Sequence, residues 1–143
     1  MGAALAAKEL GQGQRTILFI GDGSFQLTAQ ELSVMIRSKL NVIIFLIENN
    51  GYTIEKFIHG EKADYNQIAR WDYSALTKAF GGTPESTTNY EARTTHELEE
   101  VLKNETVING QGVRFITVFM PESDAPRALK KTAKASADLN AKN

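Results

Sequence analysis

Three apolar runs along the chain are candidates for buried strands. They are TILFIG at 16–21, NVIIFLIEN at 41–49 and RFITVFM at 114–120, and each is rich in Ile, Val and Phe. None of them alternates cleanly between apolar and polar positions, which is typical of parallel strands that are covered on both faces. The pattern therefore predicts parallel strands in the middle layer of a domain.

Segments with helical periodicity separate these runs. In residues 27–40 the apolar side chains recur at helical spacing, and further helices are expected over 73–82, 95–104 and 124–142. A helix of this length is the usual connection between neighbouring parallel strands. The alternation predicts an α/β fold, a doubly wound parallel sheet with helices on both faces, in one domain over residues 1–143. The stretch GGTPESTTNYEA at 81–92 is expected to be a surface loop.

The composition excludes several classes of function. The 16 Lys and Arg residues against 17 Asp and Glu residues give a net charge of -1, so we expect no nucleic-acid partner and no anionic membrane surface. The chain has no cysteine, which excludes disulfides and thiolate metal sites and favours a cytoplasmic location. It also has no run of eighteen apolar residues, so no membrane span is expected.

The first strand is followed directly by Asp22 and Gly23. Asp-Gly between apolar residues is a strong hairpin signal, so a type I′ turn is one interpretation. The helical periodicity that follows favours a turn from strand to helix, at the sheet edge where ligands bind. There Gly21 and Gly23 would let phosphate oxygens approach the backbone, and Ser24 would add a hydroxyl. Asp22 would repel a phosphate unless a hard divalent cation such as magnesium bound both groups.

The second strand ends in a comparable way, in ENNGYTIEKF at 48–57. Asn50-Gly51 could also form a hairpin turn, and this alternative stays open on the sequence. Parallel neighbours, however, would bring both strand ends to the same edge of the sheet. Asp22, the amide oxygen of Asn49 and a carbonyl beside Gly51 would then be three oxygen ligands for magnesium. Asn49 follows Asp22 by 27 residues, which is about one crossover of strand, helix and strand.

These residues carry a resemblance to a known family. GDGS followed by NNG resembles the thiamine-diphosphate-binding motif, and GDGSFQLTAQELSVMIR, NNGYTIEKFIHG and YNQIARWDYSAL are together similar to the pyruvate decarboxylase family of 2-oxo-acid decarboxylases. The similarity extends over essentially the whole chain. It implies the thiamine-diphosphate-binding fold, with thiamine diphosphate and magnesium as cofactors.

The resemblance also implies roles for residues of both turns. Asp22, Asn49 and the carbonyl of Gly51 would bind magnesium, and Glu55 would be the catalytic carboxylate that acts after the substrate has added to the cofactor. Glu48 is a departure from the family pattern that adds a carboxylate just before Asn49. Gly23, Ser24, Tyr52 and Thr53 would lie along the diphosphate, and Ile54 would pack near the thiazolium. The whole set of expected cofactor-binding residues is Gly21, Asp22, Gly23, Ser24, Asn49, Gly51, Tyr52, Thr53 and Ile54.

Family members are several times longer than this chain. The resemblance implies that the pyrimidine of the cofactor is held by an N-terminal domain of a partner subunit, in a homodimer or homotetramer. We therefore expect residues 1–143 to be a C-terminal fragment that carries half of an active site. The expected reaction is the decarboxylation of a 2-oxo acid, pyruvate to acetaldehyde and carbon dioxide. Alternatives are indolepyruvate or phenylpyruvate as substrate, or a non-catalytic cofactor-binding or assembly module.

Other residues with potential chemistry have simpler interpretations. His59 and His96 stand far apart without the arrangement of a catalytic triad, so surface positions are expected. Lys56 is expected on a solvated face, and Trp71 is expected to be a packing anchor. The glycines form neither a GxGxxG motif nor a Walker loop, which makes nicotinamide and ATP weak alternatives.

Overall fold

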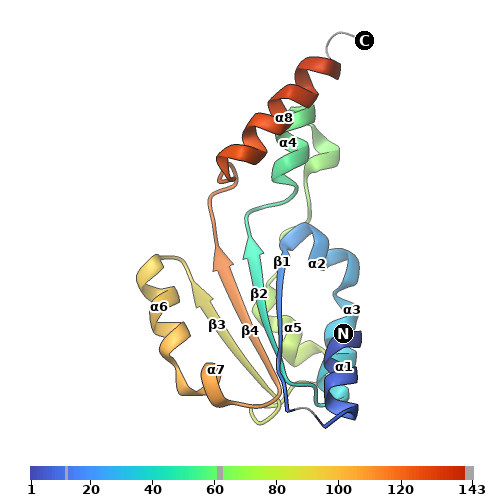
Figure 1. Ribbon diagram of the computed structural model, residues 1–143, viewed down its shortest axis with the longest axis vertical. Coiled ribbons are helices and arrows are strands. Elements are labelled where there is room, and N and C mark those ends of the chain that lie inside the picture. Colours follow the sequence, from blue (N-terminus) through green and yellow to red (C-terminus); the bar gives the residue numbers. More distant parts are fainter. Residues whose placement is uncertain (12, 61–62, 141–143) are drawn as a thin grey trace.

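A parallel sheet forms the middle layer of the computed structural model, which describes residues 1–11, 13–60 and 63–140 (Figure 1). Within these ranges the sheet has four strands in the order β1-β2-β4-β3. Their bounds are β1 (Thr16–Gly21), β2 (Val42–Glu48), β3 (Thr87–Ala92) and β4 (Val113–Phe119). All three strand pairs are parallel. The three strands expected from the apolar runs are therefore confirmed.

Helices pack against both faces of this sheet. One face carries α1 (Gly2–Glu9), α2 (Asp22–Thr28), α3 (Gln30–Arg37) and α5 (Tyr73–Ala79), and the other carries α6 (Thr95–Lys103) and α7 (Glu105–Asn109) (Figure 1). Beyond the carboxyl ends of the strands, α4 (Thr53–His59) packs against α8 (Arg127–Asn140), and the 3-10 helix η1 (Asp64–Asn66) contacts α4. The expected α/β doubly wound fold is confirmed.

Strand β2 shows why the apolar runs lack alternation. Its residues Ile44 and Leu46 belong to the core cluster under α3 and α5, whereas Ile43 and Phe45 belong to the cluster under α6 and α7. Successive side chains of a strand point to opposite faces, so a strand covered on both faces needs apolar residues at every position. The central position of β2 is thus encoded directly in its sequence.

The expected surface loop over 81–92 is wrong in its second half, where β3 forms. Its residues TTNYEA are mostly polar and partly exposed. Within the described part of the chain, β3 lies at the edge of the sheet and pairs only with β4. An edge strand needs less apolar surface than a central one, so its composition resembles that of a loop.

Both hairpin interpretations are also wrong. Strands β1 and β2 are parallel, and the residues after each turn form helices, α2 after Asp22 and α4 after the turn at Asn50-Gly51. The helix expected over residues 27–40 consists of parts of α2 and α3, which are separated at Ala29. Helix α4 lies in a segment for which no helix was predicted from the sequence.

Strand β1 forms the other edge of the described sheet and carries exposed apolar side chains. Ile17 and Phe19 of β1 are 53% and 69% exposed, and Leu27 of α2 is 79% exposed. The ring of Phe19 stacks on Phe45 with 4.8 Å between the ring centroids. None of the helices in the described ranges is both long and apolar enough to cross a bilayer.

Two glycines with positive φ give a test of the packing at the sheet. Gly112 (φ +81°) lies just before β4, and a Cβ there would sit 2.4 Å from the carbonyl oxygen of Ser86, whereas a Cβ on Gly81 (φ +85°) would meet nothing within 4 Å. An L-residue at positive φ costs about 1–2 kcal/mol, and forcing an extra methyl into a packed site costs about 1–3 kcal/mol more. We expect Gly112→Ala to lower the free energy of unfolding by both the backbone cost and the packing cost. Gly81→Ala should lower it by the backbone cost alone. Urea denaturation of both variants measures the difference, and equal losses would contradict the predicted clash.

Candidate functional site

Asp22 is a buried carboxylate at the point where β1 ends and α2 begins. Its side chain is 1% exposed. Oδ1 accepts a hydrogen bond from the backbone N–H of Gly23 at 2.7 Å, and Oδ2 accepts one from the N–H of Asn49 at 3.2 Å. The N–H of Gly51 donates to both carboxylate oxygens, at 3.3 and 3.2 Å. Because these donors surround it, the charge is compensated by backbone dipoles although no described cationic side chain forms an ion pair with it.

Three oxygen atoms converge beside this carboxylate. The amide of Asn49 is oriented with Nδ2 donating to Thr53 Oγ1 at 2.8 Å. Its oxygen then lies 3.2 Å from Asp22 Oδ1 and 3.2 Å from the carbonyl oxygen of Gly51. Turning the amide by 180° would replace these two oxygen–oxygen contacts with hydrogen bonds from its nitrogen. In the orientation of the structure, the three oxygens lack a hydrogen between them and form an electronegative cluster.

The shape of the second turn produces this convergence. Asn50 (φ +61°) and Gly51 (φ +111°) both adopt positive φ. At Gly51 a side chain is also excluded by space, because a Cβ would lie 2.9 Å from the carbonyl oxygen of Asn66. The turn directs the Gly51 N–H toward Asp22, and the N–H of Thr53 donates to the Gly51 carbonyl at 3.1 Å. A glycine is therefore required here for the geometry of the oxygen cluster.

The extra carboxylate of Glu48 lies next to this cluster, at the end of β2. Burial, and in second place the charge of Asp22, raises the pKa of the Glu48 carboxyl, while Arg93 and Arg70 oppose the shift. The described part of the chain contains no group of three His, Asp or Glu side chains that could hold a metal. The oxygen cluster differs from such a group, because it consists of one carboxylate, one amide oxygen and one backbone carbonyl oxygen.

The structure brings most of the predicted site residues to these two turns. Gly21 ends β1 and has open space where a Cβ would lie, and Ser24 is exposed in the first turn of α2. At Gly23 the corresponding space is filled by the ring of Tyr52, whose hydroxyl donates to the Gly23 carbonyl at 3.3 Å. A glycine is therefore needed for the close contact between this backbone and the Tyr52 ring, and the expected diphosphate contact of Gly23 stays a prediction. The last predicted residues begin α4: Thr53 is buried, Ile54 is half-buried and Glu55 is exposed.

Two residues of the site were missed by sequence reasoning. Lys56 is 4% exposed, so the expected solvated position is wrong; its Nζ donates to the carbonyl of Asn50 at 2.7 Å and forms an ion pair with the Glu122 carboxylate. Hydrogen bonds from Lys56, and then from Asn50, lower the pKa of the Glu122 carboxyl. Glu122 follows β4 and lies 66 residues from Lys56, so no local spacing could have indicated the pair.

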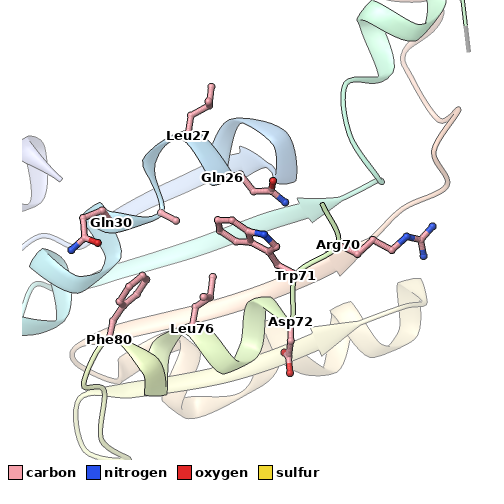
Figure 2. Close-up of a pocket in the computed structure, with 9 residues that line it drawn as sticks. Gln26, Leu27, Gln30, Arg70, Trp71, Asp72, Leu76 and Phe80 are labelled. Atoms are coloured by element: carbon pink, nitrogen blue, oxygen red, sulfur yellow. The ribbon is translucent and has the colours of Figure 1, made fainter. Parts of the chain in front are cut away.

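A separate open cavity of about 660 Å³ lies on the α2 side of the sheet (Figure 2). Figure 2 shows the indole of Trp71 inside it, between Gln26 of α2 and Leu76 of α5. Gln26 Nε2 donates to the Ala69 carbonyl at 2.6 Å and to the Tyr73 hydroxyl at 2.9 Å. Trp71 is 37% exposed and its ring lies 6.1 Å from that of Tyr73, so the expected packing role is only partly fulfilled. None of the oxygen-cluster residues lines this cavity.

Comparison with known proteins gives a consistent family match. The family model described as thiamine pyrophosphate enzyme, C-terminal TPP binding domain, matches residues 1–118. A pyruvate decarboxylase of Aspergillus fumigatus is 50% identical over 139 residues, which are 97% of this chain and 24% of that protein. Pyruvate decarboxylase isozyme 2 of Saccharomyces cerevisiae is 48% identical over 145 residues, and a pyruvate decarboxylase of Candida glabrata is 46% identical over 142 residues; in each case 99% of this chain and 25% of the relative are covered.

This chain thus spans about a quarter of the length of the curated relatives that it matches. The match includes both turns of the candidate site, because residues 22–53 lie within the matched range. The expected family and the expected cofactor, thiamine diphosphate, are confirmed. The chain belongs to the thiamine pyrophosphate enzyme family and corresponds to its C-terminal TPP-binding domain.

Proposed function

We propose that this chain forms the diphosphate- and magnesium-binding half of the active site of a 2-oxo-acid decarboxylase. The proposed reaction converts pyruvate to acetaldehyde and carbon dioxide. The observation that carries the proposal is the cluster of Asp22, Asn49 and Gly51 oxygens at two adjacent strand ends. The choice of reaction is supported by the names of relatives that are 44–50% identical to this chain.

The oxygen cluster fits a magnesium ion. Mg²⁺ prefers octahedral coordination by oxygen at about 2.0–2.1 Å, so two neighbouring ligands lie about 3.0 Å apart. The amide oxygen of Asn49 lies 3.2 Å from Asp22 Oδ1 and from the Gly51 carbonyl oxygen, and all three are the hard ligands that Mg²⁺ selects. A cation there would remove the repulsion between these oxygens. In our proposal these three atoms hold magnesium, which in turn binds the diphosphate.

The rest of the two turns would hold and orient the diphosphate. Gly21 leaves the backbone at the end of β1 accessible, and the exposed Ser24 offers a hydroxyl beside it. Ile54 is half-buried at the start of α4 and would present an apolar surface toward the thiazolium. Thiamine diphosphate held by these residues would supply the electron sink that decarboxylation of a 2-oxo acid requires.

Glu55 is the proposed proton-transfer residue. It is exposed in the first turn of α4, four residues after Gly51, and its carboxylate forms no hydrogen bond or ion pair with another described residue. Its carboxyl group is therefore not committed to a structural role within the described chain. We propose that it donates a proton to the product carbon after carbon dioxide has left.

The other half of the site is proposed to come from the N-terminal pyrimidine-binding domain of a partner subunit, in a homodimer or homotetramer located in the cytoplasm. Two observations support an interface with further protein. The relatives are about four times as long as this chain. In addition, the exposed Ile17 and Phe19 give the β1 edge apolar surface of the kind that interfaces cover.

The metal assignment is tested by substituting Asp22 and Asn49 in the intact protein. Loss of an outer partner of a metal ligand costs about 10–100-fold in metal affinity, so removing the carboxylate itself in Asp22→Ala should weaken magnesium-dependent cofactor binding by at least about 100-fold. Asn49→Ala, which removes a neutral amide, should weaken it less. Titrations of thiamine diphosphate with and without Mg²⁺ measure both effects, and circular dichroism verifies folding. Asp138→Ala, which removes an exposed carboxylate in α8, is the control; wild-type affinity in Asp22→Ala would refute the assignment.

Glu55→Gln separates binding from chemistry, because glutamine keeps the shape but does not transfer a proton. We expect both kcat and kcat/KM for pyruvate to fall by about 10²–10⁴-fold in the intact protein, the usual contribution of acid–base catalysis, with cofactor affinity nearly unchanged. Steady-state kinetics and a cofactor titration provide the two measurements. Glu99→Gln, at an exposed position of α6, should match the wild type. Full turnover by Glu55→Gln would remove Glu55 from the mechanism.

The division of the site between domains makes a further prediction. The purified 143-residue chain should show no measurable conversion of pyruvate with thiamine diphosphate and Mg²⁺ present, because the groups proposed to activate the pyrimidine are on another domain. An assay that couples acetaldehyde formation to NADH oxidation measures this. Turnover by the chain alone would show that the two-domain site is wrong.

A further inference from the structure

The amide of Asn49 is in contact with a hydroxyl that the metal proposal does not use. Thr53 is buried, and its Oγ1 lies 2.8 Å from Asn49 Nδ2 and 2.8 Å from the carbonyl oxygen of Glu122. A carbonyl oxygen can only accept, so the bond between Thr53 and Glu122 uses the single hydrogen of the hydroxyl. The remaining lone pairs of Oγ1 can then only accept, and their partner on Asn49 must be the NH₂ group.

This count of hydrogens determines which end of the amide faces Asp22. With NH₂ directed at Thr53, the amide oxygen points toward Asp22 Oδ1 and the Gly51 carbonyl oxygen, each 3.2 Å away. We propose that Thr53 is a positioning residue, whose hydroxyl holds the Asn49 amide with its oxygen toward the cation site before the cation binds. The inference rests on the proposed function, because it assigns a role toward the magnesium of that site.

The competing state is the turned amide. Its nitrogen would donate to Asp22 Oδ1 and to the Gly51 carbonyl, and its oxygen would face Thr53. The hydroxyl would then have to serve two acceptors, the amide oxygen and the Glu122 carbonyl, with one hydrogen. One of these part-buried acceptors would stay without a hydrogen bond from the described chain, and the bond from Asn49 Nδ2 to Thr53 Oγ1 would be lost. Together these two losses offset the two new bonds of the turned amide.

The Glu122 carbonyl can act in this way because its segment is fixed. The backbone N–H of Met120 donates to the Glu48 carbonyl at 2.9 Å, which extends the pairing of β4 with β2 past the end of the strand. Two residues later the Glu122 carboxylate binds the buried Lys56 and accepts from Asn50 Nδ2 at 3.1 Å. The orientation of a ligand after β2 thus depends on a backbone carbonyl after β4.

Removal of the hydroxyl should have opposite effects on the two states. In Thr53→Val or Thr53→Ala no hydroxyl is present that would have to serve two acceptors with one hydrogen. The population of the turned amide therefore rises, and the population of the amide orientation that binds the cation falls. Apparent affinity falls in proportion to the fraction of competent molecules. We expect the affinity for a divalent cation to fall by about tenfold, the lower end of the range for outer partners of metal ligands. Thr53→Ser keeps the hydroxyl and should bind within about threefold of the wild type.

The test uses the intact protein at a saturating concentration of thiamine diphosphate, with Mn²⁺ as the probe and free Mn²⁺ measured by electron paramagnetic resonance. Melting temperatures without metal are measured in parallel. A positioning role predicts weaker Mn²⁺ binding in Thr53→Val and Thr53→Ala, rescue in Thr53→Ser, and a metal-free melting temperature near that of the wild type. A merely structural role predicts that Thr53→Val and Thr53→Ala both melt at a lower temperature than the wild type without metal, and that both keep the wild-type affinity for Mn²⁺.

Failure of this inference and failure of the proposed function give different results. If Thr53→Val and Thr53→Ala bind Mn²⁺ as tightly as the wild type while Asp22→Ala does not, the positioning role is wrong and the metal site stands. If Asp22→Ala also binds Mn²⁺ like the wild type, the metal site itself is wrong. Thr53→Ala makes the test independent of how well the valine side chain fits, because it removes the same hydroxyl without adding a methyl group. Loss of binding in Thr53→Ser would also overturn the proposal.

Discussion

One buried carboxylate connects the two turns on which this site depends. Asp22 lies at the end of β1, and backbone N–H groups of Asn49 and Gly51, just beyond β2, donate to it. A buried carboxylate without partners would cost far more free energy than a typical contact contributes, so these bonds are required once Asp22 is buried. The positive-φ turn at Asn50 and Gly51 is the backbone geometry that provides them.

The sheet determines that these groups meet. Parallel pairing aligns Gly21 with Ile47, so β1 and β2 end side by side and the turns that follow are neighbours. The apolar residues of β2 are buried on both faces, which fixes the position of the strand and therefore of the residues after it. Carboxylate, amide and carbonyl oxygens are consequently held close together by a core in which none of them takes part.

Much of this arrangement could be predicted from the sequence. The strands around 41–49 and 114–120 are covered on both faces, and such strands have a distinctive apolar composition. The strand around 16–21 has a similar composition, although Ile17 and Phe19 on one of its faces are exposed. Strand β3 was missed because at the edge of the described sheet it remains partly exposed and polar. Asp22 and Asn49 could be placed near each other because consecutive parallel strands end at the same edge. The motif of the family then assigned the carbonyl of Gly51 itself and added Glu55, and the roles of both remain proposals.

The sequence by itself determined the layers of the fold, the two strand ends and the identity of the polar residues there, because these depend on local periodicity and on short spacings. Only the tertiary structure decided that Lys56 is buried against Glu122 and that the hydroxyl of Thr53 donates to the Glu122 carbonyl. It also decided that Arg114, inside an apolar strand, is 0% exposed and donates to the Gly110 carbonyl and to Asn41. Most of these contacts join residues 66–73 positions apart. No periodic pattern relates residues at such distances, so their pairing follows only from the way the strands and helices pack.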